Sequence, residues 1–367
     1  MKLGRLVFAA LMSMLVISLS ACNWFERHET VVYRGDAAHR GVFAGDGPGN
    51  FSAPVWTFKT GYSITGSPVS LDGVLFVGSM DRKVYAVDPA NGQKKWEAAA
   101  EGSILGAPAP NGRQLITADI GGALLAFNPE NGQRLWKYAA SGELRATPLA
   151  VDGVVYVGSM DGKFHAVDAD DGKLKWQVDL GEPVEAAASC DQKALYVTTA
   201  KGGLYALDLS GKTLWTFRTG REIVATPAVH EGVVYVGSRD RFFYAIDSQT
   251  GKPKWQFRAG NEVASAAAIQ EGVVVFGADD SRLYGLNAAT GAGLWSVETR
   301  GMVNGSPAIA GQRVFFGSRD GHFYAVDLKT GQVRGKFQAG GWVRSAPTII
   351  GKRAYFGSDD GKLYALE

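Results

Sequence analysis

The sequence predicts an all-β fold, an eight-bladed β-propeller made of four-stranded antiparallel blades, on three observations. A tryptophan recurs at intervals of about 40 residues along most of the chain. Between these tryptophans, short apolar runs alternate β-branched or aromatic side chains with small ones, which is typical of short strands. Turn residues separate the runs, and four strands with three turns fill one interval without room for a helix. The tryptophans are Trp56, Trp96, Trp136, Trp176, Trp215, Trp255 and Trp295.

The strands of one repeat are clearest between residues 67 and 96. After a short first strand, we expect strands at residues 74–79 and 84–87 and a fourth around Trp96. An Asp-Gly pair follows the second strand in several repeats, where it supplies the positive φ angles of a tight hairpin. The turn after the third strand begins with an Asp that can bond its own backbone and ends near a Gly that accepts a left-handed conformation.

The repeat count predicts eight blades and a closed ring. The tryptophan series begins at Trp56, before any complete repeat, and the last repeat ends at Glu367, before its own tryptophan strand. Residues 55–58 should therefore form the outer strand of the last blade, which removes the open edges of the array. Gly335 stands where an eighth tryptophan would fall, which predicts one loosely docked blade. The equivalent third-strand residues of the eight repeats are Tyr85, Leu125, His165, Tyr205, Tyr244, Tyr284, Tyr324 and Tyr364.

The amino-terminal residues predict export and lipidation. Lys2 and Arg5 precede an apolar run that is too short to span a bilayer, which indicates a signal peptide over residues 1–21. Small residues directly before Cys22 form the bacterial lipobox pattern, which makes Cys22 the expected acylated residue. Asn23 follows, where an Asp would favour retention in the inner membrane. We therefore expect a protein that is lipid-anchored in the outer membrane and faces the periplasm.

Composition and charge exclude several classes of function. Without residues 1–21, the basic and acidic residues balance at 36 each, and this argues against nucleic acid as a partner. After lipidation Cys190 is the only remaining cysteine, so packing rather than disulfides must stabilise the fold. The five histidines are scattered, and no hydrolase or nucleotide-binding motif is present. The sequence predicts no metal site, no cofactor and no catalytic residue. Residues 22–50 lack sustained periodicity and are expected to be the lipidated cysteine followed by a tether and entry segment, which leads into the propeller at residues 51–367.

One motif carries a resemblance to a known family. The pattern A-x-D-x-x-x-G-x-x-x-W, as from Ala86 through Asp88 and Gly92 to Trp96, resembles the tryptophan-docking motif of the PQQ-like, quinoprotein-type propeller repeats. The resemblance covers about residues 51–367, and residues 34–39 resemble the segment that precedes such repeats. In this motif a large indole wedges between adjacent blades, and its N–H reaches a backbone acceptor.

The family contains two classes that differ in chemistry. Quinoprotein dehydrogenases hold a quinone and calcium over the propeller axis with a pair of adjacent cysteines, whereas this chain has no such pair and nearly minimal blades. Outer-membrane assembly lipoproteins of the BamB type are bare eight-bladed rings on a lipid anchor, and the chain resembles this second class. The resemblance implies a non-catalytic scaffold, monomeric within a complex, for the barrel-assembly machinery (a BamA-type protein) or nascent barrel proteins. The alternatives are a quinone- or small-ligand-binding propeller and an interaction lipoprotein of another envelope complex.

The innermost strand of each repeat suggests a contact site. Its variable position lies between an apolar residue and a small one, and by β alternation it projects near the mouth of the central channel. Arg145, Glu185, Asn304 and Arg344 occupy this position and are the candidate contact residues, with a solvated channel lining as the alternative. The assembly family docks its partner through an apolar residue beside an Arg, and Leu144-Arg145 and Val343-Arg344 resemble such pairs. The chain departs from the family at Pro183-Val184-Glu185, where we expect that pair.

Overall fold

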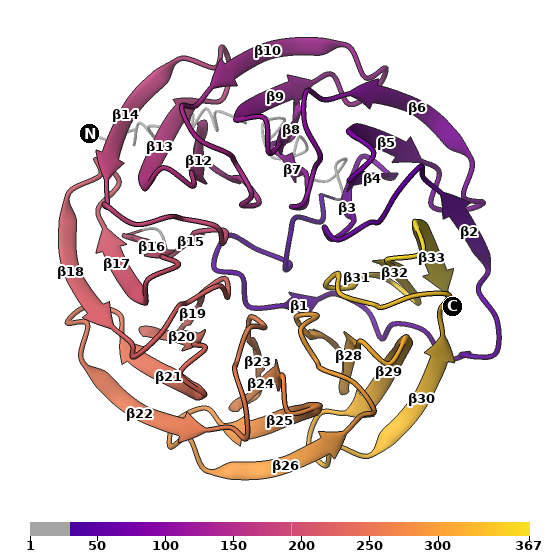
Figure 1. Ribbon diagram of the computed structural model, residues 1–367. Coiled ribbons are helices and arrows are strands. Elements are labelled where there is room, and N and C mark those ends of the chain that lie inside the picture. Colours follow the sequence, from indigo (N-terminus) through magenta and orange to yellow (C-terminus); the bar gives the residue numbers. More distant parts are fainter. Residues whose placement is uncertain (1–29, 192) are drawn as a thin grey trace, which may run out of the picture.

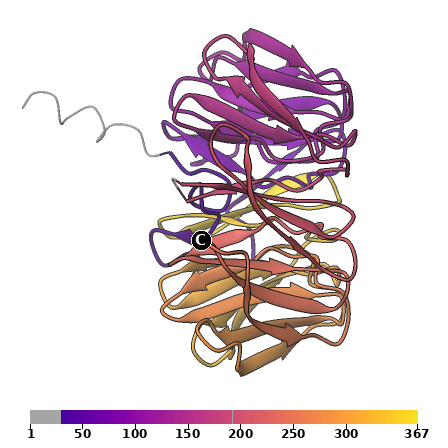
Figure 2. The same ribbon diagram turned by 90° about the vertical axis from the view of Figure 1, so that its left-hand side faces the viewer.

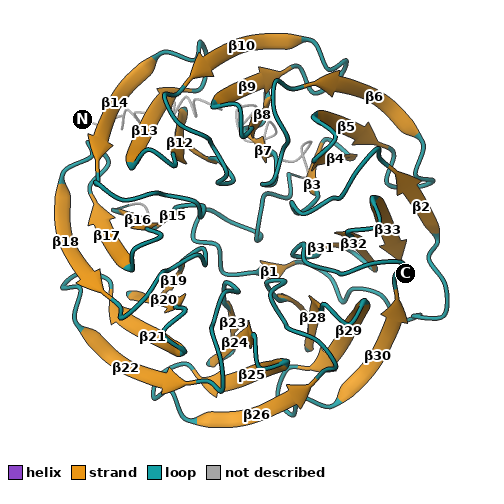
Figure 3. Cartoon of the chain, in the orientation of Figure 1, coloured by secondary structure: helices purple, strands orange, loops and turns teal. Residues whose placement is uncertain are grey.

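The computed structural model describes residues 30–191 and 193–367, and it confirms the predicted fold class. Eight sheets surround a central axis, and no helix occurs among the described residues (Figures 1 and 3). The described part of the chain therefore contains no helix that could cross a membrane. The predicted signal peptide and the lipidation site at Cys22 lie outside the described residues.

Each blade consists of four antiparallel strands ordered from the axis outward, and blade 7 carries one extra strand. Blades 1 to 4 contain β3 (Val69–Leu71), β4 (Val74–Ser79), β5 (Lys83–Val87), β6 (Lys94–Ala99); β7 (Ala109–Pro110), β8 (Leu115–Ala118), β9 (Ala123–Phe127), β10 (Arg134–Ala139); β11 (Leu149–Val151), β12 (Val154–Gly158), β13 (Lys163–Asp168), β14 (Leu174–Asp179); and β15 (Ser189–Cys190), β16 (Leu195–Thr198), β17 (Gly203–Leu207), β18 (Thr213–Arg218).

The second half of the ring repeats this arrangement. Blades 5 to 8 contain β19 (Ala228–His230), β20 (Val233–Gly237), β21 (Phe242–Asp247), β22 (Pro253–Arg258); β23 (Ala268–Gln270), β24 (Val273–Ala278), β25 (Arg282–Asn287), β26 (Gly293–Glu298); β27 (Ala308–Ala310), β28 (Arg313–Gly317), β29 (His322–Asp327), β30 (Val333–Gln338) with β1 (Val42–Phe43); and β31 (Thr348–Ile350), β32 (Arg353–Gly357), β33 (Lys362–Leu366), β2 (Trp56–Lys59).

The hydrophobic core lies between blades rather than within them. The two middle strands of a blade are buried on both faces, because a neighbouring sheet covers each face. One core cluster, for example, combines Phe76 and Val84 of blade 1 with Leu115 and Leu125 of blade 2. The outer strands alternate between partly buried and exposed side chains, since only their inner face meets another sheet.

The seven tryptophans dock each blade onto the next one. Each indole N–H donates to the backbone carbonyl of the residue 33 positions later, at N···O distances between 2.9 and 3.1 Å. The ring lies against the glycine of the turn after the third strand of that next blade. At Gly92, which has a φ of 74°, a Cβ atom would lie 2.7 Å from the indole of Trp56. The motif therefore requires both the large residue and the residue without a side chain.

The two ends of the chain close the ring in the predicted way. Strand β2 pairs antiparallel with β33, and Trp56 lies opposite Ala365 in the register. Figure 1 shows indigo β2 beside yellow β33 in blade 8. The backbone N–H of Asn50 also donates to the carbonyl of Glu367 at 3.0 Å.

The junction at Gly335 is filled from a distant part of the sequence. The fourth strand of blade 8 is β2, from the other end of the sequence, so no turn glycine between β33 and a following strand is present for a tryptophan at position 335 to cover. Phe51 occupies this place instead, and a Cβ atom on Gly335 would lie 2.4 Å from its ring. The junction lacks the indole hydrogen bond, but it is not the loose contact that Gly335 suggested.

A lead-in segment, residues 30–47, crosses the axis and closes one end of the channel. Figure 1 shows it in indigo at the centre of the ring, and the side view places its start on the left-hand face (Figure 2). Its carbonyls accept hydrogen bonds from the innermost strands of blades 1, 4, 5, 6 and 7, and β1 adds to β27 in parallel. Residues 30–47 are thus part of the folded body. The donating amides belong to Ser70, Cys190, Val229, Ile269 and Ile309.

Two buried polar residues fix the path of the lead-in segment. The guanidinium of Arg34, whose residue is only 2 % exposed, donates to the carbonyls of His39, Pro307 and Ala267. His39 is equally buried, and this burial, with the nearby Arg34 charge, lowers the pKa of its imidazole to about 3. The imidazole is therefore neutral at physiological pH.

The Phe51–Gly335 contact predicts a coupled effect on stability. Gly335→Ala should destabilise the protein by about 1–3 kcal/mol, because the added methyl group overlaps the Phe51 ring. The same substitution should cost much less in a Phe51→Ala background. Calorimetric melting of the double-mutant cycle measures this coupling. Gly293→Ala in β26 is the matched control, since a Cβ there meets nothing closer than 3.9 Å, and equal effects of Gly335→Ala in both backgrounds would contradict the contact.

His39 predicts a defined acid sensitivity. Its pKa is lower in the folded state than the ordinary value of 6.5, so the unfolded chain takes up a proton first. Stability should therefore fall as the pH decreases from 6.5 toward 3, by up to about 1.4 kcal/mol per pH unit from this group. His39→Asn, which suits the φ of 53° at this position, should remove this slope from unfolding curves measured across that range. The slope should persist in His230→Asn.

Candidate functional site

The open end of the channel, here called the mouth, is built from repeated loops. In each blade the segment before the innermost strand and the turn between the second and third strands lie side by side at this end. The N–H of Met80, for example, donates to the carbonyl of Ser63, and the N–H of Asp359 donates to that of Trp342. The mouth holds a cavity of about 180 Å³. Tyr33 of the lead-in segment also lines this cavity and forms its inner end.

Three of the predicted contact residues meet at this cavity. Arg145, Glu185 and Arg344, from blades 3, 4 and 8, all line it, which the sequence spacing alone could not place. Arg145 pairs with Glu143 at 2.7 Å, and Arg344 pairs with Asp359 at 2.9 Å. Glu185 has no ion pair within the described residues, so it is the uncompensated charge of the cavity.

The other three predicted contact residues lie elsewhere. Asn304 is beside the mouth, where its side-chain amide donates to Asp279 rather than facing the cavity. Leu144 and Val343 are 0 % and 1 % exposed, so their prediction as partner-binding residues is corrected. Both pack in the core between blades, and Val343 fills the space above Gly317, where a Cβ would come within 2.4 Å of it. The apolar residue of the pair therefore serves blade packing.

The residue before each innermost strand is small because neighbouring blades approach closely there. A Cβ atom on Gly66 would lie 2.3 Å from the carbonyl oxygen of Gly106 in the next blade. Ser265 and Ser345 fit because their hydroxyls bond within their own blades, to the carbonyls of Gly277 and Gly357. Close approach of neighbouring blades at the axis allows only small side chains here.

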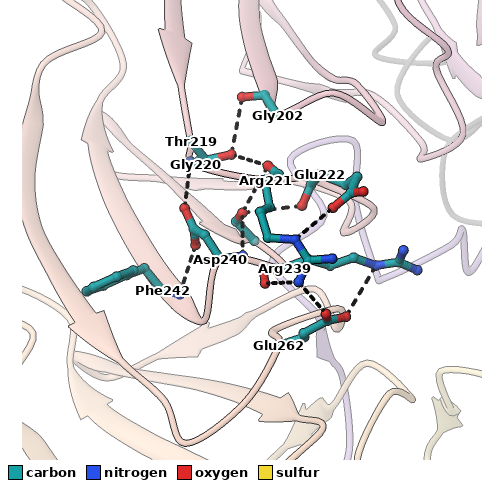
Figure 4. Close-up of polar contacts among 10 residues, drawn as sticks. Gly202, Thr219, Gly220, Arg221, Glu222, Arg239, Asp240, Phe242 and Glu262 are labelled. Carbon is teal, nitrogen blue, oxygen red and sulfur yellow. Dashed lines mark hydrogen bonds and ion pairs between the residues drawn. The ribbon is translucent and has the colours of Figure 1, made fainter.

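Part of the mouth face is strongly charged, and the sequence reasoning missed it. Arg221 pairs with Glu262 at 2.7 Å and with Glu222 at 3.4 Å, and Arg239 lies 3.6 Å from Glu262 (Figure 4). Neighbouring Asp240 accepts hydrogen bonds from the amides of Gly220 and Phe242, which holds these loops together. We call Arg221, Glu222, Arg239, Glu262, Asp279, Asn304 and Arg319, from blades 5 to 7, the charged arc.

The charged arc contains unsatisfied hydrogen-bonding groups. Asn304 Oδ1 and Arg319 Nε are buried without a hydrogen-bond partner among the described residues. Glu222 Oε2 and Arg239 Nε also lack a hydrogen bond there, and their only polar contacts are the ion pairs at 3.4 and 3.6 Å. Burial is also the main cause that raises the pKa of Asp279 above its ordinary value. Buried polar atoms in native proteins are normally paired with protein, water or a ligand. This arc is therefore suited to receive polar groups from outside the chain.

The mouth face also exposes several large apolar side chains, here called the apolar arc. Trp342 and Tyr62 are 49 % and 60 % exposed, and Met302 and Ile120 are exposed as well. The guanidinium of Arg319 lies 5.2 Å from the Trp342 ring, where the charged arc meets this apolar arc. The sequence contained a signal for this division of the mouth face. The residue after the second strand of each blade is apolar in blades 1 to 4 and charged in blades 5 to 8. Those residues are Met80, Ile120, Met160, Ala200, Arg239, Asp279, Arg319 and Asp359.

The described residues contain no group of three or more His, Cys, Asp or Glu side chains arranged to hold a metal ion. His165 replaces the repeat tyrosine and is buried, with its Nδ1 atom 2.9 Å from the hydroxyl of Tyr138. Its burial lowers the pKa of the imidazole. This histidine packs between blades 2 and 3.

Comparison with known proteins identifies the family. A family model described as the outer membrane protein assembly factor BamB matches residues 52–183, 141–226, 201–337 and 280–367. The chain belongs to this family. The match confirms the resemblance carried by the tryptophan-docking motif, and it covers the whole propeller downstream of the lead-in segment. No curated protein matches the chain.

Solved structures share the BamB-like architecture at low sequence identity. BamB from Moraxella catarrhalis is 21 % identical with a TM-score of 0.75, over 85 % of this chain and 98 % of that one. A quinohemoprotein alcohol dehydrogenase from Comamonas testosteroni is 15 % identical with a TM-score of 0.79, over 91 % of this chain and 80 % of that one. A computationally designed protein is 19 % identical with a TM-score of 0.76, over 84 % of this chain and 97 % of that one. These likenesses show the fold alone.

The raised pKa of Asp279 predicts a stabilising substitution. Because the folded state holds this proton more tightly than the unfolded chain, the ionised carboxylate is unfavourable above the folded pKa. Asp279→Asn should therefore raise the unfolding free energy at pH 7, and its advantage should disappear below about pH 3.8, where both states are protonated. Asp280→Asn is the matched comparison. It should destabilise by about 1–3 kcal/mol, because Asp280 accepts bonds from Gly260 and Tyr284.

Proposed function

We propose that this chain is a non-catalytic, lipid-anchored scaffold of the outer membrane that docks the barrel-assembly machinery through its mouth face. The observation that carries the proposal is the family match over the entire propeller. The mouth face adds a physical reason, because it joins exposed aromatic and Arg side chains, the residue types that dominate protein interfaces. Its expected partner is a BamA-type protein, and nascent barrel proteins are the other expected client.

The proposed lipid anchor would orient the propeller relative to the membrane. Lipidation at Cys22 would leave eight residues before Thr30, a distance of at most about 29 Å even when fully extended. Thr30 begins the lead-in segment, which lies at the closed end of the channel. The closed end would therefore face the membrane, and the mouth would point into the periplasm toward soluble domains of a partner.

A quinone-binding propeller is the second candidate, since quinohemoprotein dehydrogenases share the fold. Two features favour the scaffold. The sequence has only Cys22 and Cys190, so it lacks the adjacent cysteines of the dehydrogenase class. The mouth cavity of about 180 Å³ is also smaller than the usual range of about 300–1,000 Å³ for small-molecule sites.

The proposal predicts that charge reversal at the mouth weakens docking. The BamA-type protein should co-purify with the wild-type chain from solubilised envelopes. Arg145→Glu and Arg344→Glu should each reduce its affinity at least about tenfold, because each places a like charge beside Glu143 or Asp359. Affinity pull-down with titration of the purified partner measures this change.

Lys95→Glu, on the exposed outer strand β6 at its end away from the mouth, is the control and should leave docking unchanged. If neither reversal at the mouth weakens an observed complex, the mouth face is not the docking surface. Calcium-dependent quinone binding together with dye-linked alcohol oxidation would overturn the non-catalytic proposal.

A further inference from the structure

A second concave surface lies at the closed end of the channel, opposite the mouth. This side cleft, of about 340 Å³, is bounded by the lead-in segment and by the innermost strands β7 and β11 of blades 2 and 3. Its walls are mainly Ala, Val, Leu and Pro side chains. Tyr33, Asp36 and His39 of the lead-in segment and Asp152 of blade 3 supply its polar groups.

The side cleft lies where the lead-in segment leaves two blades uncovered. In blades 1 and 4, one residue of the innermost strand donates its backbone N–H to a carbonyl of the lead-in segment. These residues are Ser70 and Cys190, and they occupy the same register position. Blades 5, 6 and 7 make the same hydrogen bond. Blade 8 does not donate at this position, but the carbonyl of its Gly351 accepts a hydrogen bond from the N–H of Gly47. Residues 30–50 make no such bond with β7 or β11.

The two uncovered blades differ in whether the innermost strand has a backbone N–H that can donate into the cleft. The equivalent residue in blade 2 is Pro110, which has no N–H to donate. In blade 3 it is Ala150, whose pairing with Val155 matches that of Cys190 with Leu195. The N–H of Ala150 is therefore directed at the side cleft, in the way that Cys190 is directed at the lead-in segment.

The polar groups of the side cleft favour a cationic, hydrogen-bonding occupant. Asp36 is paired with Arg40 at 2.6 Å, whereas Asp152 forms no ion pair with another described residue. No Lys or Arg lines the cleft, so its net charge is negative. His39 Nδ1 is buried without a hydrogen-bond partner among the described residues. An occupant could accept from the Ala150 amide and pair with the Asp152 carboxylate at the same time.

We propose that the side cleft binds an extended segment of a partner polypeptide, whose backbone carbonyl accepts from Ala150 and whose Lys or Arg side chain pairs with Asp152. The chain itself supplies the precedent, because its own lead-in segment binds the neighbouring blades through the same amide position. Strand addition of this kind draws affinity from backbone bonds and selectivity from side chains. The site shares only Tyr33 with the lining of the mouth cavity, and it does not depend on the function proposed for the mouth.

Peptide titration of the full chain tests the proposal. The probe is acetyl-Ala-Val-Lys-Val-Ala-amide, and the same peptide with Glu in place of Lys is its control. The Lys peptide should bind, and the Glu peptide should not. Asp152→Asn should weaken binding of the Lys peptide about tenfold or more, because it removes a charge-assisted bond. Ala150→Pro should weaken it comparably, and Pro110 shows that this strand position accommodates proline.

Two controls separate the site from its surroundings. Glu231→Gln, in the equivalent hairpin of blade 5 and outside the cleft, should leave peptide affinity unchanged, and so should Arg145→Glu at the mouth. Equal binding of the Lys and Glu peptides, or unchanged binding to Ala150→Pro with an unaltered melting temperature, would overturn the proposal. Equally tight binding of butylamine would assign the cleft to small cations instead. A concentration-dependent dimer that excludes the peptide would assign it to a second copy of the chain, and either result would overturn the proposal.

Discussion

The structure depends on one repeated contact, the indole of one blade lying on the turn glycine of the next. A blade on its own exposes two apolar faces, so its strands are stable only when neighbours cover them. The tryptophan sets the spacing and angle between neighbours, because its N–H must reach a particular carbonyl while its ring fits where a side chain is missing. Repeating that geometry around the axis bends the array into a ring, and ring closure then leaves no unpaired sheet at either end.

The junction that closes the ring also packs an aromatic ring onto a glycine, but with different residues. At the junction between blades 7 and 8, Phe51 packs onto Gly335 in place of an indole on a turn glycine. The lead-in segment adds a second set of bonds, because it offers carbonyls to amides that point into the channel. Without those carbonyls, the amides of five innermost strands would face the axis without a protein partner. One end of the channel is thereby filled by the chain itself, and only the mouth remains open.

This asymmetry shapes the functional proposals. The residues that vary between blades are concentrated in the loops around the mouth, where they form a charged arc and an apolar arc that meet at Trp342 and Arg319. Regular blade packing leaves these positions free, since none of them covers a neighbouring sheet. At the closed end, the uneven path of the lead-in segment creates a different surface, in which an edge amide and an unpaired carboxylate lie within one cleft. Under the two proposals, the mouth and the side cleft would hold different partners of the same scaffold.

The sequence by itself determined the architecture of this protein. Blade number, ring closure, the docking tryptophans and the small residues at the axis all follow from periodic patterns, because each serves a contact that recurs in every blade. The tertiary structure decided what happens where the pattern breaks. It buried Leu144 and Val343 under neighbouring blades, brought Phe51 to Gly335, and drew residues 30–47 into the body. It also gathered the charged arc from three blades. Contacts between residues far apart in the chain, or made only once, leave no period in the sequence, so only the folded ring reveals them.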